Sequence, residues 1–409
     1  MSVRPALVST YPPRRCGLAT FAAHLRGGLL AAGARSVPVV AVVKEPSVLR
    51  QAPEVLYEIR QEHAGDYREA AAALNTAGVD VVLLQHEFGI FGGTAGTMVQ
   101  ELLAHLRVPV VATLHTILAE PDPEYREAFL ALLDRVDRVV TMAARGVELL
   151  QEVYGVPPER IELIPHGVPE PPAGTAETWK ERLGLAGRTV AMTFGLIGPG
   201  KGIETALRAI AEAVRACPDL LYLVVGATHP EVLRREGERY RRSLEALAVE
   251  LGLADHVRFV DRYLDEDELL GYLMACDLYL SPYPGAQQIT SGTLTYALAM
   301  GKAVISTPYT YAREMLAGGA GRLVPFGDVQ AMARAVTELA RNPELRAGLG
   351  SRARRRTRGF AWRDVGARYL NLAARTAPHA RPASIAPARA GTRARAVREV
   401  AGHREVVRS

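Results

Sequence analysis

The stretch TVAMTFGLIGPGKGIETALRAI, residues 189–210, decides the fold class. It begins with a run of apolar and β-branched residues, passes through a loop rich in glycine and proline, and ends with the apolar spacing of a helix. A buried strand that leads directly into a helix is the repeating unit of a parallel sheet covered by helices on both faces. The rest of the chain repeats this unit.

Strand-like runs alternate with helix-like stretches on both sides of this segment. Before it we expect strands at ALVSTYP (6–12), VPVVAVV (37–43), VDVVLLQHEF (79–88), VPVVATLHT (108–116) and DRVVTMA (137–143). After it we expect strands at LLYLVVGA (220–227), VRFVDRY (257–263), LYLSPY (278–283) and AVISTPY (303–309). The alternation of strands and helices is interrupted at the proline-rich stretch 165–172. The sequence therefore predicts two doubly wound α/β domains joined by a linker. Their ligands should bind in the cleft between the carboxyl ends of the strands.

Composition favours a globular protein. The 409 residues are 48% hydrophobic and 23% charged, and we find no uncharged apolar run of about 18 residues that would predict a transmembrane helix. The first residues do not have the pattern of a secretory signal. Three widely spaced cysteines indicate a reducing compartment, so we expect a cytoplasmic protein without a metal cluster.

The net charge of +5 lies in the last segment of the chain. Residues 376–409 hold seven arginines and two glutamates, so residues 1–375 sum to zero. We expect this tail, rich in Ala, Arg and Pro, to be disordered. It would be either a solvated extension or a peripheral contact to an anionic membrane. Nucleic acid is not expected as a partner, because the body of the protein is neutral.

The loops of the first domain carry four candidate residues. Gly17 follows the first strand, where backbone N–H groups can approach a phosphate or a sugar. His86 and Glu87 end the third strand in QHEFGIFGG, and His115 ends the fourth in TLHTI. A carboxylate and an imidazole at a strand end can hold sugar hydroxyls or move a proton. A core histidine and a capping glutamate are the alternative.

In the second domain the loop GPGKG suits a diphosphate. Gly198 and Gly200 open the backbone, and Lys201 supplies a positive charge beside the start of a helix. The loop is not a Walker motif, because GKS or GKT is missing, and an ordinary turn is the alternative reading.

A second helix start lies at Ser291, Gly292 and Thr293, ahead of TLTYALAMG. Its first N–H groups should point at the cleft. They would then meet the same anion as the GPGKG loop from another side, so the two loops together favour a nucleotide diphosphate.

In their order and spacing, the motifs of these loops resemble those of glycosyltransferase family 4, whose members are retaining enzymes of the GT-B fold. The resemblance covers about residues 5–375 and rests on RCGLATF, TLHT, IPHGV, GPGKG and ALAMGKAVIST. The segment FAWRDVGARYLNL (360–372) resembles the final helix of the family. The resemblance implies an acceptor domain over 1–168, a donor domain over 169–358, a helix that crosses back over 359–375 and the tail over 376–409.

The resemblance also implies roles for the candidate residues. Gly17 would lie near the donor phosphate, His115 near the transferred sugar, and Lys201 at the leaving diphosphate. We expect His115, Lys201 and Glu87 to be catalytic, and His86 and Glu87 to bind the acceptor. The expected donor contacts are Gly17, Gly198, Gly200, Lys201, Arg262, Tyr263, Gln288, Ser291, Gly292, Thr293, Leu294 and Tyr296.

Three positions depart from the family pattern. Leu196 stands where an arginine is usual, and Gln288 and Tyr296 replace two glutamates that hold the donor sugar and the ribose. Each lost charge-assisted hydrogen bond removes about 1.5–3 kcal/mol of binding. The chain is therefore either a branch of the family with altered donor contacts or a binder that has lost turnover.

The expected reaction transfers a hexose with retention of configuration from a nucleotide sugar, GDP-mannose or UDP-glucose, to a glycan, lipid or small-molecule acceptor. Lys201 and the backbone amides would stabilise the leaving diphosphate, with no metal ion and no cofactor. The two domains should open and close about the 165–172 linker. The alternatives are a sugar-nucleotide epimerase, a phosphorylase, or a scaffold that binds nucleotide sugars without turnover.

Overall fold

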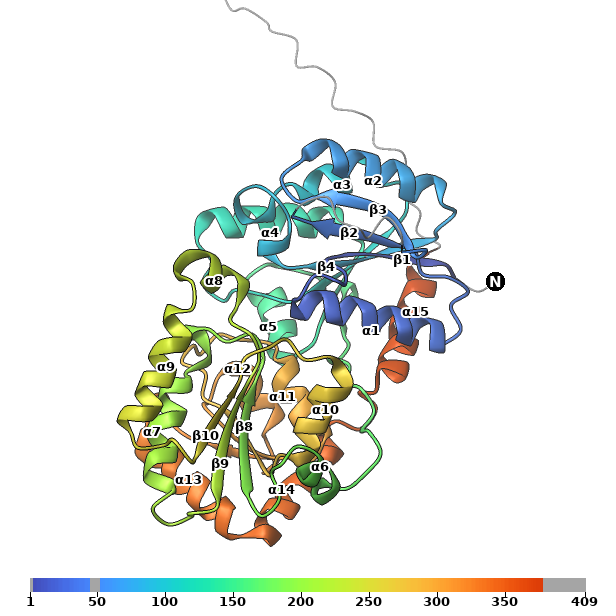
Figure 1. Ribbon diagram of the computed structural model, residues 1–409. Coiled ribbons are helices and arrows are strands. Elements are labelled where there is room, and N and C mark those ends of the chain that lie inside the picture. The colour runs from blue at the N-terminus through green and yellow to red at the C-terminus, as the bar shows by residue number, and fades with distance from the viewer. Residues whose placement is uncertain (1–2, 45–51, 378–409) are drawn as a thin grey trace, which may run out of the picture.

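Two α/β domains make up the computed structural model, which describes residues 3–44 and 52–377 (Figure 1). The first domain is built on a parallel sheet of seven strands in the order β3-β2-β1-β4-β5-β6-β7. The strands are β1 (Pro5–Ser9), β2 (Val39–Val43), β3 (Val55–Arg60), β4 (Val81–His86), β5 (Val110–Leu114), β6 (Arg138–Thr141) and β7 (Ile161–Leu163).

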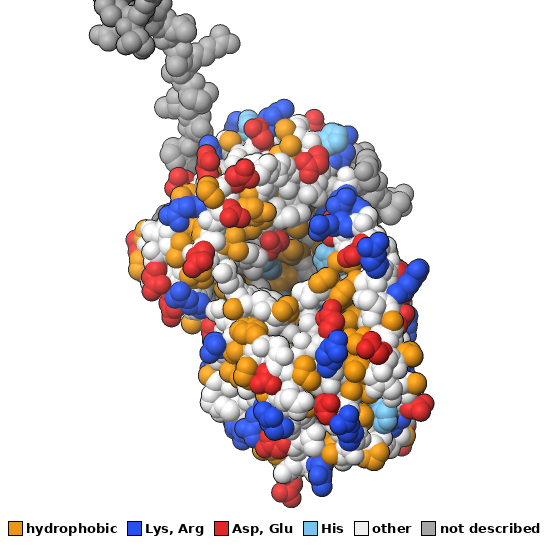
Figure 2. All heavy atoms as spheres, turned by 90° about the vertical axis from the view of Figure 1, so that its left-hand side faces the viewer, with side chains coloured by type: hydrophobic (Ala, Val, Ile, Leu, Met, Phe, Trp, Pro, Cys, Tyr) orange, Lys and Arg blue, Asp and Glu red, His pale blue; other side chains and the backbone are white. Residues whose placement is uncertain are grey.

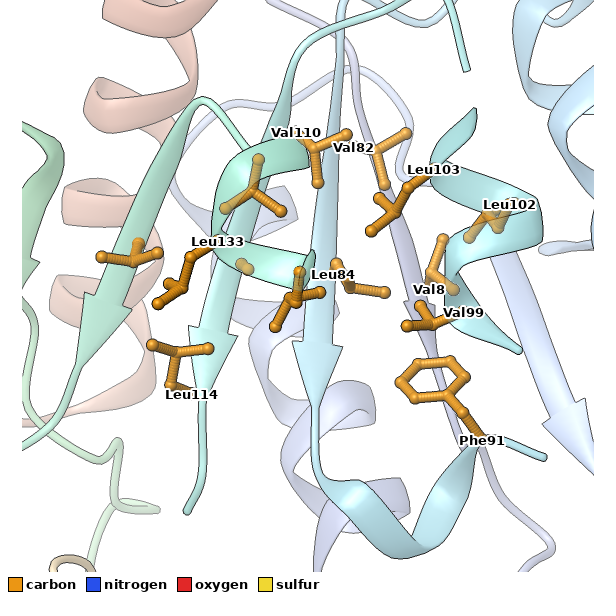
Figure 3. Close-up of a cluster of buried hydrophobic side chains, with 14 of the residues drawn as sticks. Val8, Val82, Leu84, Phe91, Val99, Leu102, Leu103, Val110, Leu114 and Leu133 are labelled. Atoms are coloured by element: carbon orange, nitrogen blue, oxygen red, sulfur yellow. The ribbon is translucent and has the colours of Figure 1, made fainter. Parts of the chain in front are cut away.

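Helices cover both faces of this sheet. They are α1 (Gly17–Ala31), α2 (Ala64–Thr76), α3 (Val99–His105), α4 (Pro123–Arg135) and α5 (Ala144–Glu152), with short 3-10 turns at Phe88–Ile90, Thr94–Gly96 and Pro158–Arg160. Alternate strand residues face opposite ways. Val8 points into the cluster under α2, α3 and α4, whereas Leu7 points into the cluster under α1. Figure 3 shows the first cluster, in which Leu84 from β4 lies between Leu133 and Val99 from two helices.

The second domain repeats the plan with a parallel sheet of six strands in the order β10-β9-β8-β11-β12-β13. The strands are β8 (Thr189–Phe194), β9 (Leu220–Val225), β10 (Val257–Val260), β11 (Leu278–Ser281), β12 (Ala303–Ser306) and β13 (Arg322–Leu323). The helices are α6 (Ala176–Arg182), α7 (Ile203–Ala213), α8 (Pro230–Glu236), α9 (Arg239–Glu250), α10 (Glu266–Ala275), α11 (Gly292–Ala299), α12 (Thr310–Met315), α13 (Val329–Arg341) and α14 (Pro343–Arg356), with a 3-10 turn at Pro199–Lys201.

The strand order places one switch point in each sheet. The chain runs outward from β1 through β2 to β3, returns to β4 on the other side of β1, and does the same around β8 and β11. Loops that leave two neighbouring strands in opposite directions open a crevice at the carboxyl ends of those strands. The prediction of two doubly wound domains that face a cleft is confirmed, and the loops with the candidate residues leave these switch-point strands.

The last helix, α15 (Trp362–Thr376), packs against α1 of the first domain although it follows the second (Figure 1). Two glycines make this contact close. A Cβ atom on Gly28 of α1 would lie 2.2 Å from the Trp362 carbonyl oxygen, and one on Gly366 of α15 would lie 2.2 Å from the Gly28 carbonyl carbon. The chain therefore crosses between the domains twice. The two crossing segments are hydrogen-bonded to each other. The Val168 amide donates to the Phe360 carbonyl oxygen, and the Trp362 amide donates to the Val168 carbonyl oxygen.

Some elements differ from the sequence prediction. The sequence does not predict strands β3, β7 and β13. Strand β3 lies at the edge of its sheet, where Leu56 is 38% exposed, so it lacks a continuous buried apolar run. Strands β7 and β13 have only three and two residues, too few for a recognisable pattern. Among the described residues no helix is long and apolar enough to cross a membrane. The tail predicted to be disordered lies outside the described residues from 378 onward.

Candidate functional site

A cavity of about 450 Å³ lies between the two domains at their switch points. Figure 2 shows the molecule hollowed between its two lobes. The first domain contributes Gly17, Thr20 and Phe21 of α1, and the linker contributes His166. The second domain contributes Phe194, Gly195, Leu196, Lys201, Val225, Gly226, Ala227, His229, Tyr263, Leu264, Asp265, Glu266, Leu269, Gly292, Thr293 and Tyr296. The lining comes mainly from the second domain, with one wall from the first.

Lys201 and the start of α11 meet at one end of this cavity. Lys201 Nζ donates to the Tyr283 hydroxyl at 2.8 Å, and that hydroxyl lies 3.0 Å from Thr293 Oγ1. Thr293 Oγ1 lies 3.3 Å from Ser291 Oγ. Although burial raises the pKa of Tyr283, the positive charge of Lys201 brings it below its ordinary value. A line of hydroxyls thus joins the two loops that the sequence assigns to a diphosphate.

The start of α11 presents free backbone donors to the cavity. Ser291 is the N-cap, and its hydroxyl accepts from the Leu294 amide at 3.3 Å. The amides of Gly292 and Thr293 precede the first intrahelical hydrogen bond, so the helix supplies no acceptor for them. Both residues line the cavity, where the positive end of the helix dipole favours an anion.

Glycines let the loops approach one another closely. Gly202 has φ +64°, and a Cβ atom there would lie 2.0 Å from the carbonyl oxygen of Pro282. Only glycine therefore allows the Lys201 loop to pack against the loop that leaves β11. Gly17 differs, because a Cβ atom on it would have no atom within 4 Å. The space in front of the α1 start is open on the cavity side, where Gly17 is a lining residue.

His115 lies behind Phe21. The two rings meet edge to face with centroids 4.8 Å apart, and His115 Nε2 lies 3.0 Å from Gln85 Oε1. Burial, with a smaller contribution from His166 and His86, lowers the pKa of His115 to about 3. The imidazole is therefore neutral at pH 7, and its Nε2–H donates to the Gln85 carbonyl. His115 is not among the residues that line the cavity.

The other two first-domain candidates make contacts within that domain. His86 is 2% exposed and contacts the rings of Phe88, Phe91 and Phe129. Burial lowers its pKa to about 3. Glu87 accepts from Thr116 Oγ1 at 2.6 Å and from the Phe88 amide at 3.0 Å. Burial raises the pKa of Glu87, although these hydrogen bonds act in the opposite sense. Neither residue lines the cavity.

The remaining donor candidates divide into two groups. Tyr263 and Tyr296 line the cavity. In the loop that contains Gly198, the lining residues are Leu196 and Lys201. The others do not line it: Gly198, Gly200, Arg262, Gln288, Ser291 and Leu294. Arg262 is paired with Glu268, and the exposed Gln288 side chain donates to the Thr290 carbonyl oxygen at 2.9 Å.

Tyr296 takes part in a polar contact between the domains. Its hydroxyl lies 3.3 Å from His24 Nδ1, and His24 Nε2 lies 3.0 Å from Glu266 Oε2. A second such contact joins the hydroxyls of Thr20 and Tyr263 at 3.0 Å. Residues of both domains thus surround the same cavity and contact each other beside it.

Comparison with known proteins assigns both domains. The sequence pattern described as Glycosyltransferase Family 4 matches residues 17–170, and the pattern described as Glycosyl transferases group 1 matches residues 188–342. The chain belongs to glycosyltransferase family 4. Together the two matches include strands β2 to β13 and leave out β1, and residues such as Gly17, Lys201 and Thr293 fall within them.

Relatives of this family 4 chain include the following two bacterial enzymes. Phosphatidyl-myo-inositol mannosyltransferase of Mycolicibacterium smegmatis is 30% identical over 187 residues, which are 46% of this chain and 45% of that protein. D-inositol 3-phosphate glycosyltransferase of Thermobispora bispora is 30% identical over 289 residues, 65% of this chain and 64% of that protein. The chain therefore spans about half to two thirds of the length of these relatives.

The GT-B fold is shown by similarity to solved structures. Sucrose-phosphate synthase from Thermosynechococcus elongatus superimposes with a TM-score of 0.72 at 20% identity, over 91% of this chain and 98% of that one. At this identity the likeness concerns the fold alone.

Sequence reasoning does not single out two residues of this region, His166 and Tyr283. His166 lines the cavity from within the quoted motif IPHGV, and its ring lies 5.2 Å from Phe21 and 6.1 Å from Tyr296 between centroids. Burial lowers its pKa to about 4. A lone histidine in a proline-rich linker gives a weak signal. Tyr283 gives none, because its role depends on a contact with Lys201, 82 positions away.

Proposed function

We propose that this chain transfers a hexose from a nucleotide-diphosphate sugar to an acceptor hydroxyl with retention of configuration. The observation that carries the proposal is the convergence of Lys201 and the α11 start on one end of the interdomain cavity. A positive side chain and two backbone N–H groups there would bind the diphosphate and stabilise the charge that grows as it departs. The proposal includes no metal ion in that step. Among the described residues, no group of three or more His, Cys, Asp or Glu side chains is placed to hold one.

The donor nucleotide would lie against the second domain. The apolar walls from Phe194, Val225 and Leu264 suit a base and a ribose face, and Tyr263 lies beside them. GDP-mannose and UDP-glucose are the proposed donors, with mannose favoured because the relative from Mycolicibacterium smegmatis is a mannosyltransferase.

The acceptor would approach from the first domain, past Gly17 and Phe21. Both named relatives act on an inositol-containing acceptor, so a polyol phosphate or a lipid that carries one is the first acceptor to test. The neutral His115 behind Phe21 would take part through a shift of that ring, because it is not a lining residue as the cavity stands. Placement of the enzyme in the cytoplasm, where nucleotide sugars are made, belongs to the same proposal.

A nucleotide-sugar binder without turnover is the second candidate. Leu196 lines the cavity beside Lys201, where the family pattern has an arginine, and the Tyr296 hydroxyl is already engaged with His24. Such a binder would take up the donor and neither hydrolyse it nor transfer its sugar.

The test separates the two candidates. Wild type, Lys201→Ala and the control Arg334→Ala, an exposed cation on α13, are incubated with GDP-mannose or UDP-glucose and with inositol phosphate. Release of GDP or UDP is then measured. The transferase predicts release by wild type and by Arg334→Ala and a loss of about 100-fold or more in Lys201→Ala. Tight donor binding without any release in the presence of acceptors would favour the binder.

A further inference from the structure

Tyr283 contacts Lys201 and Thr293, which line the cavity, but is not itself a lining residue. Its side chain is 2% exposed, and its hydroxyl contacts both Lys201 Nζ and Thr293 Oγ1. The lysine nitrogen also lies 4.6 Å from the centre of the phenol ring, within the range of a cation–π interaction. One phenol therefore contacts a group from each of the two loops that converge on the cavity.

We propose that Tyr283 is a positioning residue that holds Lys201 and the start of α11 together as a single binding unit for a diphosphate. This inference rests on the proposed function, because it assigns the diphosphate to that end of the cavity. The Tyr283 hydroxyl accepts a hydrogen bond from Lys201 and shares a second hydrogen bond with the Thr293 hydroxyl. The ammonium group thereby keeps a fixed distance from the Gly292 and Thr293 amides.

An uncharged partner suits this task better than a carboxylate. Among the described residues, no Asp or Glu forms an ion pair with Lys201, although Lys44 and Lys180 both have carboxylate partners. A carboxylate would neutralise the lysine and compete with the phosphates. A phenol fixes the ammonium group through one hydrogen bond and leaves its full positive charge for the ligand.

The backbone around Tyr283 is itself held in place. Its carbonyl oxygen accepts from Thr307 Oγ1 at 2.6 Å, and its ring stacks on Tyr309 with centroids 5.1 Å apart. The preceding residue, Pro282, is the one whose carbonyl oxygen comes so close to Gly202 that a Cβ atom there would lie 2.0 Å away. The tyrosine is thus anchored to the loop that carries Lys201 on one side and to the segment that follows β12 on the other.

The test removes only the hydroxyl. In Tyr283→Phe the ring and its stacking stay, while Lys201 and Thr293 lose their common partner. The matched control is Tyr311→Phe, because the Tyr311 hydroxyl is also buried and also contacts a threonine of α11, Thr295 at 2.9 Å. Calorimetry measures the affinity for whichever of GDP, UDP and ADP binds wild type most tightly, and for the corresponding nucleoside. Tyr283→Phe should bind the nucleoside diphosphate about 10-fold more weakly and the nucleoside as wild type does. Tyr311→Phe should bind both as wild type does.

A double variant shows whether Tyr283 acts through the lysine. Lys201→Ala should bind the nucleoside diphosphate about 100-fold more weakly than wild type, and Lys201→Ala with Tyr283→Phe should bind it no more weakly than that. Equal losses in the two tyrosine variants, or losses that multiply in the double variant, would overturn the positioning role while leaving the proposed function in place. A wild-type protein that binds none of the three nucleotides would overturn both.

Discussion

His24 of α1 and Glu266 at the start of α10 lie 3.0 Å apart, from Nε2 to Oε2, and this contact joins the two domains beside the cavity. The Tyr296 hydroxyl, 3.3 Å from His24 Nδ1, extends the contact to α11. A histidine from the first domain thus contacts two helices of the second that line the proposed donor site. The imidazole is thus placed to hold the two domains together around the cavity.

We predict that His24→Ala weakens nucleoside diphosphate binding about 2- to 5-fold, as expected for loss of a partly exposed pair worth about 0.5–1 kcal/mol. The cause would be a larger share of molecules with the domains apart, so small-angle scattering should show a larger radius of gyration. The control is His105→Ala at the last residue of α3, where the exposed imidazole lies 2.8 Å from the Glu101 carbonyl oxygen of the same helix. Unchanged scattering and affinity in His24→Ala would contradict this role.

The close contact between α1 and α15 predicts opposite effects on stability for alanine substitutions at two adjacent glycines of α1, Gly27 and Gly28. Gly28→Ala would bring a Cβ atom to 2.2 Å from the Trp362 carbonyl oxygen, so we expect a loss of about 1–3 kcal/mol in the free energy of unfolding. A Cβ atom on the adjacent Gly27 would have no atom within 4 Å, so Gly27→Ala should stabilise α1 by about 0.5–1 kcal/mol. Urea denaturation measures both. Effects of the same sign in the two variants would show that α15 is not packed on α1 as described.

Buried histidines predict how stability depends on pH. His86 stays neutral in the folded protein down to a pKa of about 3, whereas in the unfolded chain it takes up a proton below about pH 6.5. The unfolded state binds more protons between these values, so stability falls as the pH falls from about 6.5 toward 3. His86→Phe, which replaces the imidazole in the aromatic cluster with an apolar ring that takes up no proton, should remove its share of this loss, about 3 kcal/mol at pH 4.5.

Thermal unfolding of wild type and His86→Phe across the pH range checks this prediction. The melting temperature of the variant should rise relative to wild type by a few degrees as the pH falls from 7.5 to 4.5. A constant difference between the two proteins at every pH would show that His86 is not buried in its neutral form.

Sequence alone predicts the fold and the meeting of the two loops that are proposed to bind the diphosphate, for a clear physical reason. Continuous apolar strands such as TVAMTF can only be buried on both faces, and the carboxyl ends of parallel strands meet at one edge of a sheet. The structure accordingly brings Lys201 and Thr293 together at the cavity, where both contact the Tyr283 hydroxyl.

Side-chain directions are harder to predict. His86 and His115 both end strands at the expected edge, yet His86 points into the aromatic cluster and His115 lies behind Phe21. Adjacent strand residues face opposite sides of a sheet, so a strand end places a residue without deciding whether it reaches the cleft. Tyr283 and His166 depend on contacts between distant segments, for which a single sequence has no periodic signal.

The most direct measurement of the central claim is the thermal stability of wild type and Lys201→Ala with GDP, UDP, ADP and their common sugar conjugates. At 100 times its dissociation constant a ligand adds about 2.7 kcal/mol to the free energy of unfolding, a shift of several degrees. The proposed function predicts this shift for one nucleotide family in wild type and its loss in Lys201→Ala. No shift with any nucleotide, or an equal shift in both proteins, would contradict a diphosphate site at Lys201.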